Sequence, residues 1–246
     1  MRRIGLLGGM SFESSALYYR MINEAVRERL GGWHSADILM RSVDFQVVVD
    51  MQRAGRWDEA GRYLAEAAQE LEAAGAGCIV VCTVTMHLVA PAIEAAVAVP
   101  VLHVIDVTAA RLKAARRRRP LLLATRYTME EGFYQARMKR HGIDVMIPGP
   151  DGRTLTHDII FDELCAGKVL DRSREVLIGL VAQAKAQGAD SLIFGCTEIG
   201  MILDVDGTPL PGFDSTAIHA AAAVDFALGV DAQNHGARCG EATSAS

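Results

Sequence analysis

Cysteine is scarce in this sequence, and its few copies form no metal-binding or disulfide pattern. Five cysteines occur among 246 residues, an odd number without the spacing of a disulfide framework. Neither a CxxC pair nor an HExxH motif is present, so no zinc site is predicted. Unpaired thiols are typical of a reducing compartment, and we therefore expect a cytoplasmic protein.

Positive charge and long apolar runs are also in short supply. The formal net charge is −5, which argues against a nucleic-acid binder, whose surface would be basic. The one basic run, residues 116–119, is typical of a helix C-terminus, with a polyanion contact as the alternative. No apolar run approaches the roughly 18 residues of a membrane span, and the N-terminal one is too short for a signal peptide. We expect no nucleic-acid and no membrane partner.

Short apolar runs are present in number, and they alternate with longer helical patterns. The runs are rich in Val, Ile and Leu without polar alternation, as in parallel strands that are covered on both faces. We expect strands at residues 3–7, 37–42, 78–81, 101–104, 121–124, 144–147, 191–194 and 210–213, and helices at residues 13–30, 57–74, 172–187 and 215–228. This alternation predicts a doubly wound α/β protein.

The chain also repeats itself. Residues 73–85 (AAGAGCIVVCTVT) match residues 186–198 (AQGADSLIFGCTE) at an offset of 113, and residues 4–13 more weakly match 121–130 at an offset of 117. Coincidence between two ordinary strand–helix units is the alternative. We expect two pseudo-symmetric parallel-sheet domains, residues 1–100 with 208–228 and residues 101–207, with the active site in the cleft between them. Residues 229–246 lack periodicity and predict a disordered tail.

The register of the repeat separates the cysteines. Cys196 corresponds to Thr83, whereas Cys82 corresponds to Gly195. Because side chains alternate along a strand, one step of register turns a side chain to the opposite face. We therefore expect Thr83 and Cys196 to point the same way in their domains, and Cys82 to pack inward as a small apolar residue.

Thr83 and Cys196 follow their strands, where ligands bind in parallel sheets. If the two domains face each other, these side chains flank one cleft from opposite sides. That arrangement suits inversion at carbon, in which one group removes a proton and the other delivers a proton to the opposite face. A thiol has an ordinary pKa of about 8.5, whereas a threonine hydroxyl is a poor base that can still donate a proton.

The motifs GLLGGMS (5–11), CTVTMH (82–87) and GCTEIG (195–200) resemble the cofactor-independent aspartate/glutamate racemase superfamily. The resemblance covers residues 3–228 and looks closest to the L-aspartate/glutamate-specific subgroup, in which threonine replaces the first of two catalytic cysteines. It implies a racemase of small acidic amino acids that needs neither pyridoxal phosphate nor a metal. The chain has no Walker A motif, and GLLGGM lacks the GxGxxG spacing of dinucleotide sites.

The resemblance implies roles for ten residues. Cys196 would be the base toward the L-enantiomer, with Thr83 on the opposite face. The substrate would be surrounded by Met10, Gln52, Arg53, Val84, Thr85, Lys168, Thr197 and Glu198. Arg53 and Lys168 are the candidates for its distal carboxylate. Val84 stands where the family usually has asparagine, so a hydrogen-bonding group is absent there.

Structural roles are the alternatives for several of these residues. Thr83 could cap a helix, Glu198 could complement a helix dipole, and His87 could be a hydrogen-bonded structural histidine or shuttle protons. Two other functions are open: an arylmalonate-decarboxylase-like or maleate-isomerase-like enzyme, which suits the apolar Val84, and a non-catalytic binder of carboxylates. The oligomeric state is open as well, a homodimer included.

Overall fold

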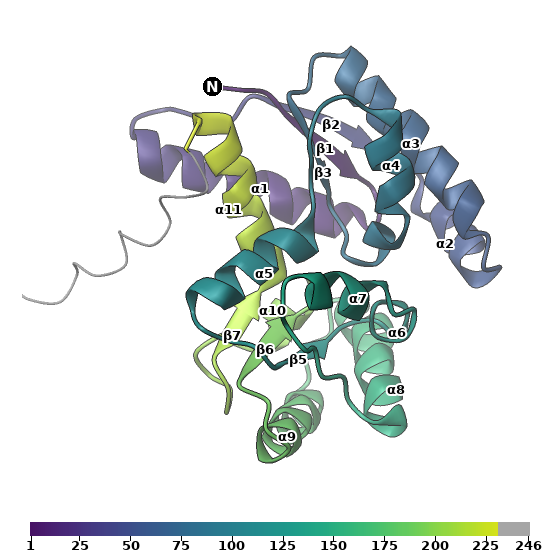
Figure 1. Cartoon of the computed structure of the whole chain (residues 1–246), viewed down its shortest axis with the longest axis vertical. Coiled ribbons are helices and arrows are strands. Elements are labelled where there is room, and N and C mark those ends of the chain that lie inside the picture. Colours follow the sequence, from purple (N-terminus) through teal and green to yellow (C-terminus); the bar gives the residue numbers. More distant parts are fainter. Residues whose placement is uncertain (231–246) are drawn as a thin grey trace, which may run out of the picture.

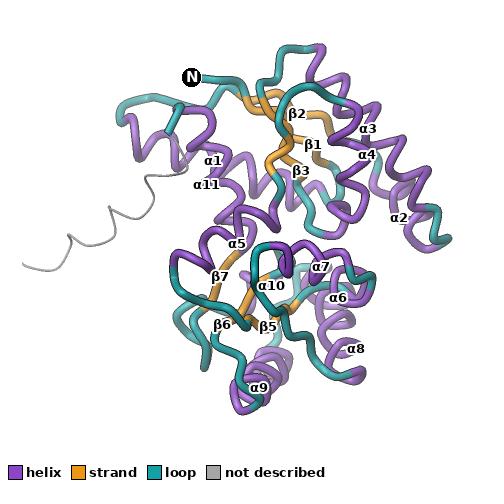
Figure 2. The backbone as a smooth tube through the Cα atoms, viewed as in Figure 1, coloured by secondary structure: helices purple, strands orange, loops and turns teal. Residues whose placement is uncertain are grey.

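The structure is a computed structural model that describes residues 1–230. In that part the chain forms two lobes, one above the other in Figure 1. Figure 2 shows the strands as two separate groups with helices around each. The expected disordered tail lies outside the described residues, apart from residues 229 and 230.

The first half of the chain builds the upper lobe. Its strands are β1 (Ile4–Gly8), β2 (Ile38–Ser42), β3 (Cys78–Val81) and β4 (Val101–Leu102). Its helices are α1 (Phe12–Leu30), α2 (Phe45–Arg53), α3 (Trp57–Ala73), the 3-10 helix η1 (Thr85–Val89) and α4 (Ala90–Ala96). The four long helices that the sequence predicts begin and end within one or two residues of their expected limits, here and below.

The second half of the chain contributes the other strands and helices. Its strands are β5 (Pro120–Leu123), β6 (Ser191–Phe194) and β7 (Gly212–Asp214). Its helices are α5 (Val104–Ala114), α6 (Arg126–Glu130), α7 (Phe133–Arg140), α8 (Pro150–Asp158), the π-helix η2 (Ile159–Glu163), the 3-10 helix η3 (Leu164–Ala166), α9 (Asp171–Ala186), α10 (Ile199–Ile202) and α11 (Ser215–Leu228). Within residues 1–230, none of the helices combines the length and the apolarity needed to cross a membrane.

The two sheets are parallel and correspond strand by strand. The first has the order β2-β1-β3-β4 and the second the order β5-β6-β7. Ile4 pairs with Cys78 in the first sheet, as Pro120 pairs with Ser191 in the second. Thus β3 corresponds to β6 at the predicted offset of 113, while β1 corresponds to β5 at 116 rather than 117. The predicted pair of pseudo-symmetric α/β sheets is confirmed.

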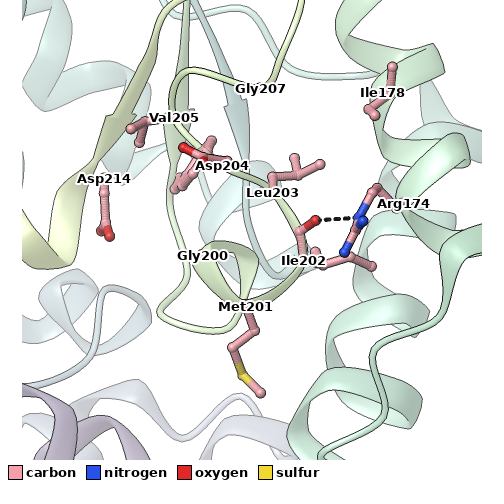
Figure 3. Close-up of a pocket in the computed structure, with 11 residues that line it drawn as sticks. Arg174, Ile178, Gly200, Met201, Ile202, Leu203, Asp204, Val205, Gly207 and Asp214 are labelled. Carbon is pink, nitrogen blue, oxygen red and sulfur yellow. Dashed lines mark hydrogen bonds between the residues drawn. The ribbon is translucent and has the colours of Figure 1, made fainter.

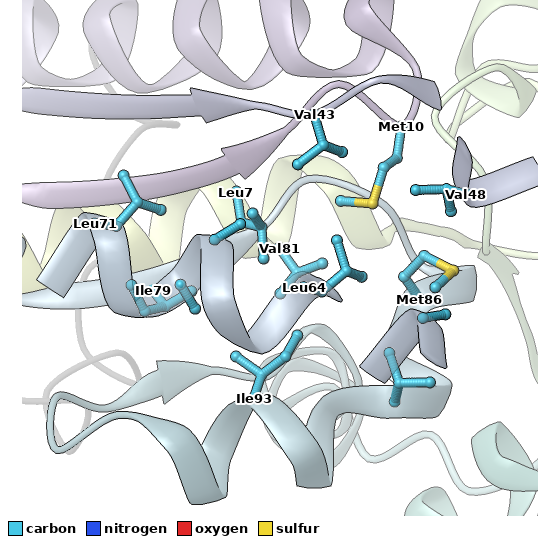
Figure 4. Packing of buried hydrophobic residues seen from close by; sticks show 14 of the residues in the cluster. Leu7, Met10, Val43, Val48, Leu64, Leu71, Ile79, Val81, Met86 and Ile93 are labelled. Carbon is cyan, nitrogen blue, oxygen red and sulfur yellow. The ribbon is translucent and has the colours of Figure 1, made fainter. Parts of the chain in front are cut away.

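Each sheet carries apolar side chains on both faces. Leu7, Ile79 and Val81 pack against α3 and α4, as Figure 4 shows. Leu6 and Val80 lie one step away in register and pack against α1 and α11. Because helices cover both faces, the strands need no polar side, which explains why their sequences do not alternate.

The helix that follows the last strand of each sheet packs on the opposite sheet. Helix α5 follows β4 of the first sheet, yet its Ala109 packs in a cluster with Leu122 and Ile193 of the second sheet. Helix α11 follows β7 of the second sheet, yet its Val224 packs with Leu6 of the first. In Figure 1, α11 runs from the lower sheet up to α1. This exchange fastens the lobes together, because separating them would expose both helices' apolar faces.

The expected division at residues 100 and 208 assigns two strands, β4 and β7, to the wrong sheet. Strand β4 pairs with β3 and strand β7 pairs with β6, so only the helix of residues 208–228 returns to the first lobe. The chain changes lobes after each of these strands, at His103 and Asp214. Both residues cap the helix that follows, because their side chains accept a backbone N–H at its start.

Three strand predictions were wrong in extent. Residues 144–147 form only an isolated parallel bridge, between Met146 and Leu121. The strand expected at residues 210–213 begins two residues later, after Pro211, which has no N–H to donate. Strand β4 stops at Leu102 because His103 already caps α5.

Candidate active site

A cavity of about 1050 Å³ is lined by residues of both halves. Thr83 and Cys196 both line it, each two residues beyond the end of its strand, β3 or β6. The structure thus brings the two repeat-related positions to one cavity. Six of the predicted substrate-binding residues line the same cavity: Met10, Gln52, Val84, Thr85, Thr197 and Glu198.

The thiol of Cys196 points at a carboxylate. Its Sγ donates a hydrogen bond to Oε2 of Glu198 at 2.8 Å, and Oγ1 of Thr197 donates to the same oxygen at 2.6 Å. Burial, and then the negative charge of Glu198, raise the pKa of Cys196 well above its ordinary value. The thiol is therefore protonated at neutral pH, and Glu198 is in position to accept its proton.

Thr83 has a histidine behind it instead of a carboxylate. The backbone oxygen of Thr83 accepts a hydrogen bond from Nδ1 of His87 at 2.8 Å. Nε2 of His87 accepts the N–H of Val104 at 3.3 Å, so the proton resides on Nδ1. Burial lowers the pKa of His87 well below its ordinary value. His87 is thus a neutral, buried histidine that supports the Thr83 turn, as the structural alternative predicted.

Hydroxyl groups connect the turn that follows β3 to the second lobe, and the turn that follows β6 to the first lobe. Oγ1 of Thr85 lies 3.1 Å from Oγ1 of Thr125 and 3.0 Å from Oγ1 of Thr128, at the start of α6. Oγ1 of Thr197 lies 2.6 Å from Oγ of Ser14, in the first turn of α1. These contacts repeat the pseudo-symmetry of the sheets at the cavity, because α1 and α6 follow corresponding strands.

The first lobe supplies a partly apolar wall. Met10 is 4% exposed and packs in the core beside the first sheet. Gln52, at the end of α2, is 9% exposed, and its Nε2 donates to Sδ of Met86 at 3.0 Å. That contact holds the Gln52 amide at the cavity wall.

Val84 and Cys82 flank Thr83 and both serve packing. Val84 lines the cavity but is 5% exposed, and it packs in the cluster that contains Val104 and Leu122. An apolar side chain there joins the turn of the first lobe to the second. Cys82 is fully buried among residues of α1 and α11, and burial raises its pKa. The prediction that Cys82 packs inward is confirmed.

The two predicted cations are not brought to the cavity. Arg53 and Lys168 are both exposed, and neither is among the residues that line it. Among the lining residues that sequence reasoning missed are Glu13 and Arg20 of α1, Asp44 before α2 and Cys165 of η3. The seven-residue spacing of Glu13 and Arg20 places both on one helix face, but nothing in the sequence says what that face meets.

Cys165 brings a second thiol to the wall near Glu198. Burial, then the charges of Glu198 and Glu13, raise its pKa to about 12. Both carboxylates therefore lie within electrostatic range of Cys165, and Glu198 also acts on the neighbouring Cys196. This end of the cavity is negatively charged.

Three buried histidines lie behind Thr83, where the chain crosses between lobes. The ring of His87 is 4.6 Å from that of His103 and 5.7 Å from that of His219. His219 is held by Tyr18 Oη at 2.9 Å and by the backbone oxygen of Leu102 at 2.6 Å. Burial lowers the pKa of His103 to about 3 and that of His219 to about 4. The cluster is neutral and ties α11 to the end of β4.

A second cavity, of about 520 Å³, lies in the second lobe and contains neither Thr83 nor Cys196. Figure 3 shows Arg174 and Asp214 on opposite sides of its 200–205 segment. Arg174 donates to the backbone oxygen of Ile202 at 2.9 Å, and Asp214 caps α11. Its charged groups are thus already engaged. In residues 1–230, no group of three or more His, Cys, Asp or Glu is placed to hold a metal ion.

Comparison with known proteins agrees with this geometry. The sequence profile of the Asp/Glu/Hydantoin racemase family matches residues 7–223. The broad-specificity amino-acid racemase RacX of Bacillus subtilis is 23% identical over 230 residues, which cover 92% of this chain and 98% of RacX. The crystal structure of an Asp/Glu racemase candidate from Yersinia pestis has a TM-score of 0.88 at 47% identity, over 93% of this chain and 100% of that one. An aspartate racemase homologue from Pyrococcus horikoshii OT3 has a TM-score of 0.83 at 29% identity, with the same coverages.

Proposed function

The chain belongs to the Asp/Glu/Hydantoin racemase family, whose members are isomerases, and from that premise we propose that it inverts the α-carbon of aspartate, glutamate or both without a cofactor. Cys196 acts as the base toward the L-enantiomer, and Thr83 serves the opposite face. The observation that carries the proposal is that these equivalent positions of the two halves line one cavity. A cytoplasmic location belongs to the same proposal, and light scattering decides between a monomer and a homodimer.

Conversion of the L-enantiomer begins at the hydrogen bond between Cys196 and Glu198. Glu198 takes the thiol proton, and the resulting thiolate removes the α-proton of the L-amino acid. The thiol is thereby restored. Glu198 then returns its proton to water in the cavity. The 2.8 Å contact between Sγ and Oε2 makes the first transfer direct.

The carbanion needs hydrogen-bond donors, because the α-proton of an amino acid is only weakly acidic. The N-terminus of α1 opens onto the cavity through Ser11, Phe12, Glu13 and Ser14. The N–H of Ser14 is capped by Oγ of Ser11 at 3.3 Å, whereas the N–H groups of Phe12 and Glu13 have no partner within the helix and favour an anion. We place the substrate α-carboxylate at these groups, where the charge that develops during proton removal is stabilised.

On the opposite face the Thr83 hydroxyl donates its proton to the carbanion. A carbanion is a much stronger base than an alkoxide, so this transfer is favourable, and water reprotonates the alkoxide. In the reverse direction Thr83 would have to act as a base, which is unfavourable at neutral pH. The proposal therefore includes faster α-proton exchange from the L-enantiomer than from the D-enantiomer, whereas net inversion, whose equilibrium constant is 1, has the same kcat/KM in both directions.

The test is proton NMR in D2O with each enantiomer of aspartate and glutamate. We expect the α-proton signal of the L-enantiomers to disappear faster than the D-enantiomers accumulate, as followed by chiral chromatography of the same samples, and we expect slow α-proton exchange of added D-enantiomers. Equal α-proton exchange rates from both enantiomers would contradict the bias.

Two further assays separate the proposed function from its alternatives. Carbon dioxide release from an arylmalonate, without α-proton exchange in any amino acid, would favour the decarboxylase alternative. A higher melting temperature with carboxylates, but no turnover, would favour a binding protein.

A further inference from the structure

The cavity has one permanent positive charge in its wall. Among the described residues that line it, Arg20 is the only lysine or arginine. Arg53 and Lys168, which the sequence offers for a substrate carboxylate, are exposed and lie outside that wall. A distal carboxylate enclosed in this cavity therefore has Arg20 as its candidate partner.

Arg20 projects from the same face of α1 as two other cavity residues. Glu13, Leu17 and Arg20 all line the cavity, and their spacing of four and then three residues places them in one row. Glu13 and Arg20 are seven residues apart, or about 10 Å along the helix axis. In an α-helix each Cα–Cβ bond tilts toward the N-terminus, so the side chain of Arg20 starts out in the direction of the first turn of α1. This brings its guanidinium closer to the turn at which the α-carboxylate is placed.

Arg20 is free to bind a ligand. Several other arginines are engaged, for example Arg137 with Asp106 at 2.6 Å and Arg153 with Glu130 at 2.7 Å. Within residues 1–230 no side-chain hydrogen bond or ion pair engages Arg20, although its helix neighbour Arg29 is paired with Asp225. An exposed, unpaired guanidinium in a cavity wall loses no existing contact when an anion arrives.

Besides Arg20, the cavity wall carries the carboxylates of Glu13, Asp44 and Glu198. Glu198 acts on both Cys196 and Cys165, and Glu13 acts on Cys165, whereas Arg20 lies about two turns farther along α1 than Glu13. An amino acid with its ammonium group near Glu13 and Glu198 can therefore direct its side chain toward Arg20. A side chain that ends in a carboxylate fits this arrangement, because guanidinium and carboxylate form charge-assisted, often bidentate hydrogen bonds.

We propose that Arg20 binds the distal carboxylate of the substrate and so selects amino acids with an anionic side chain. This inference rests on the proposed function, since it names the group that recognises the side chain at the same site.

The experiment compares L-glutamate with L-glutamine, which has nearly the same shape but no side-chain charge. Arg20→Met should lower the ratio of kcat/KM for glutamate to kcat/KM for glutamine about tenfold or more, through KM, because a hydrogen bond to a charged group is lost. Arg20→Lys should keep part of the ratio. Arg27→Met is the matched control, since Arg27 is exposed on the same helix but does not line the cavity.

The outcomes distinguish this inference from the proposed function. An unchanged ratio in Arg20→Met, or a ratio that falls only in Lys168→Met or Arg53→Met, would overturn the assignment to Arg20. Calorimetric titration with glutarate, a dicarboxylate without an α-proton to exchange, supplies a readout without turnover. If no amino acid is racemised but Arg20→Met weakens glutarate binding at least tenfold, the inference stands and the proposed reaction fails. Absence of glutarate binding in an inactive unmodified protein would overturn both.

Discussion

The two strand-end turns of this protein occupy equivalent places and carry different chemistry. After β6, Cys196 donates to the carboxylate of Glu198, which also accepts from Thr197. After β3, Thr83 has a neutral, buried His87 behind its backbone and an apolar Val84 beside it. One side of the cavity thus has a nucleophilic atom with a proton acceptor, and the other has a hydroxyl without one.

That difference shows how a duplicated scaffold can support a one-sided reaction. Both halves supply the same backbone geometry, because the sheets correspond in order and register. The side chains at Thr83 and Cys196 decide which face of the substrate meets a competent base. Three variants test this comparison, and the Cys196 side should show the largest effect.

Replacement of Cys196 by alanine should nearly abolish α-proton exchange from the L-enantiomers. A positioned acid or base contributes about 100-fold to 10,000-fold, and no other described thiol is at the repeat position. Proton NMR in D2O measures the exchange, and circular dichroism verifies the fold.

Cys82→Ala is the matched control for this loss. Cys82 is buried in the core that α1 and α11 share, so its truncation should reduce the free energy of unfolding by about 1 kcal/mol and leave exchange intact. Full exchange in Cys196→Ala, or its loss in a folded Cys82→Ala, would remove Cys196 from the mechanism.

Thr83→Cys should make the two sides of the cavity alike. A thiol at this position has no carboxylate comparable to Glu198, so a thiolate forms there more easily than at Cys196. The α-proton exchange of the D-enantiomer should rise roughly 100-fold, the lower range for an added general base. Proton NMR in D2O with each enantiomer measures the change. Thr83→Ser keeps the hydroxyl and should keep the bias; a Thr83→Cys protein with unchanged exchange from the D-enantiomer would show that another group serves that face.

Glu198→Gln should alter the pH dependence of Cys196 rather than the fold. The carboxylate raises the pKa of the thiol, so its removal should lower that pKa and move thiolate formation to lower pH. Alkylation by iodoacetamide, followed residue by residue with mass spectrometry, should therefore begin at lower pH for Cys196.

Cys165 serves as an internal comparison in the same samples. Its pKa, about 12, is also raised by Glu198, so its alkylation should move in the same direction. At neutral pH, turnover of the L-enantiomer should fall, because the variant lacks the acceptor for the thiol proton. An alkylation profile of Cys196 that does not move would mean that burial alone sets its pKa.

The sequence by itself determined the two-sheet α/β architecture and the pairing of Thr83 with Cys196. Both conclusions depend on local patterns, since a buried strand is a short apolar run and its alternation decides which way the next side chains point. The same local argument placed Cys82 in the core, where the structure has it. Short elements such as β7 shifted by a residue or two, because caps and prolines at their ends compete with strand pairing.

Only the tertiary structure decided which residues from distant segments meet. It exchanged α5 and α11 between the lobes, where their apolar residues pack in clusters with strands of the opposite sheet. It also left Arg53 and Lys168 in solvent and brought Arg20 into the cavity wall. The local sequence around a charged residue on a helix does not show which residues it will face, because those neighbours depend on how the two lobes pack together.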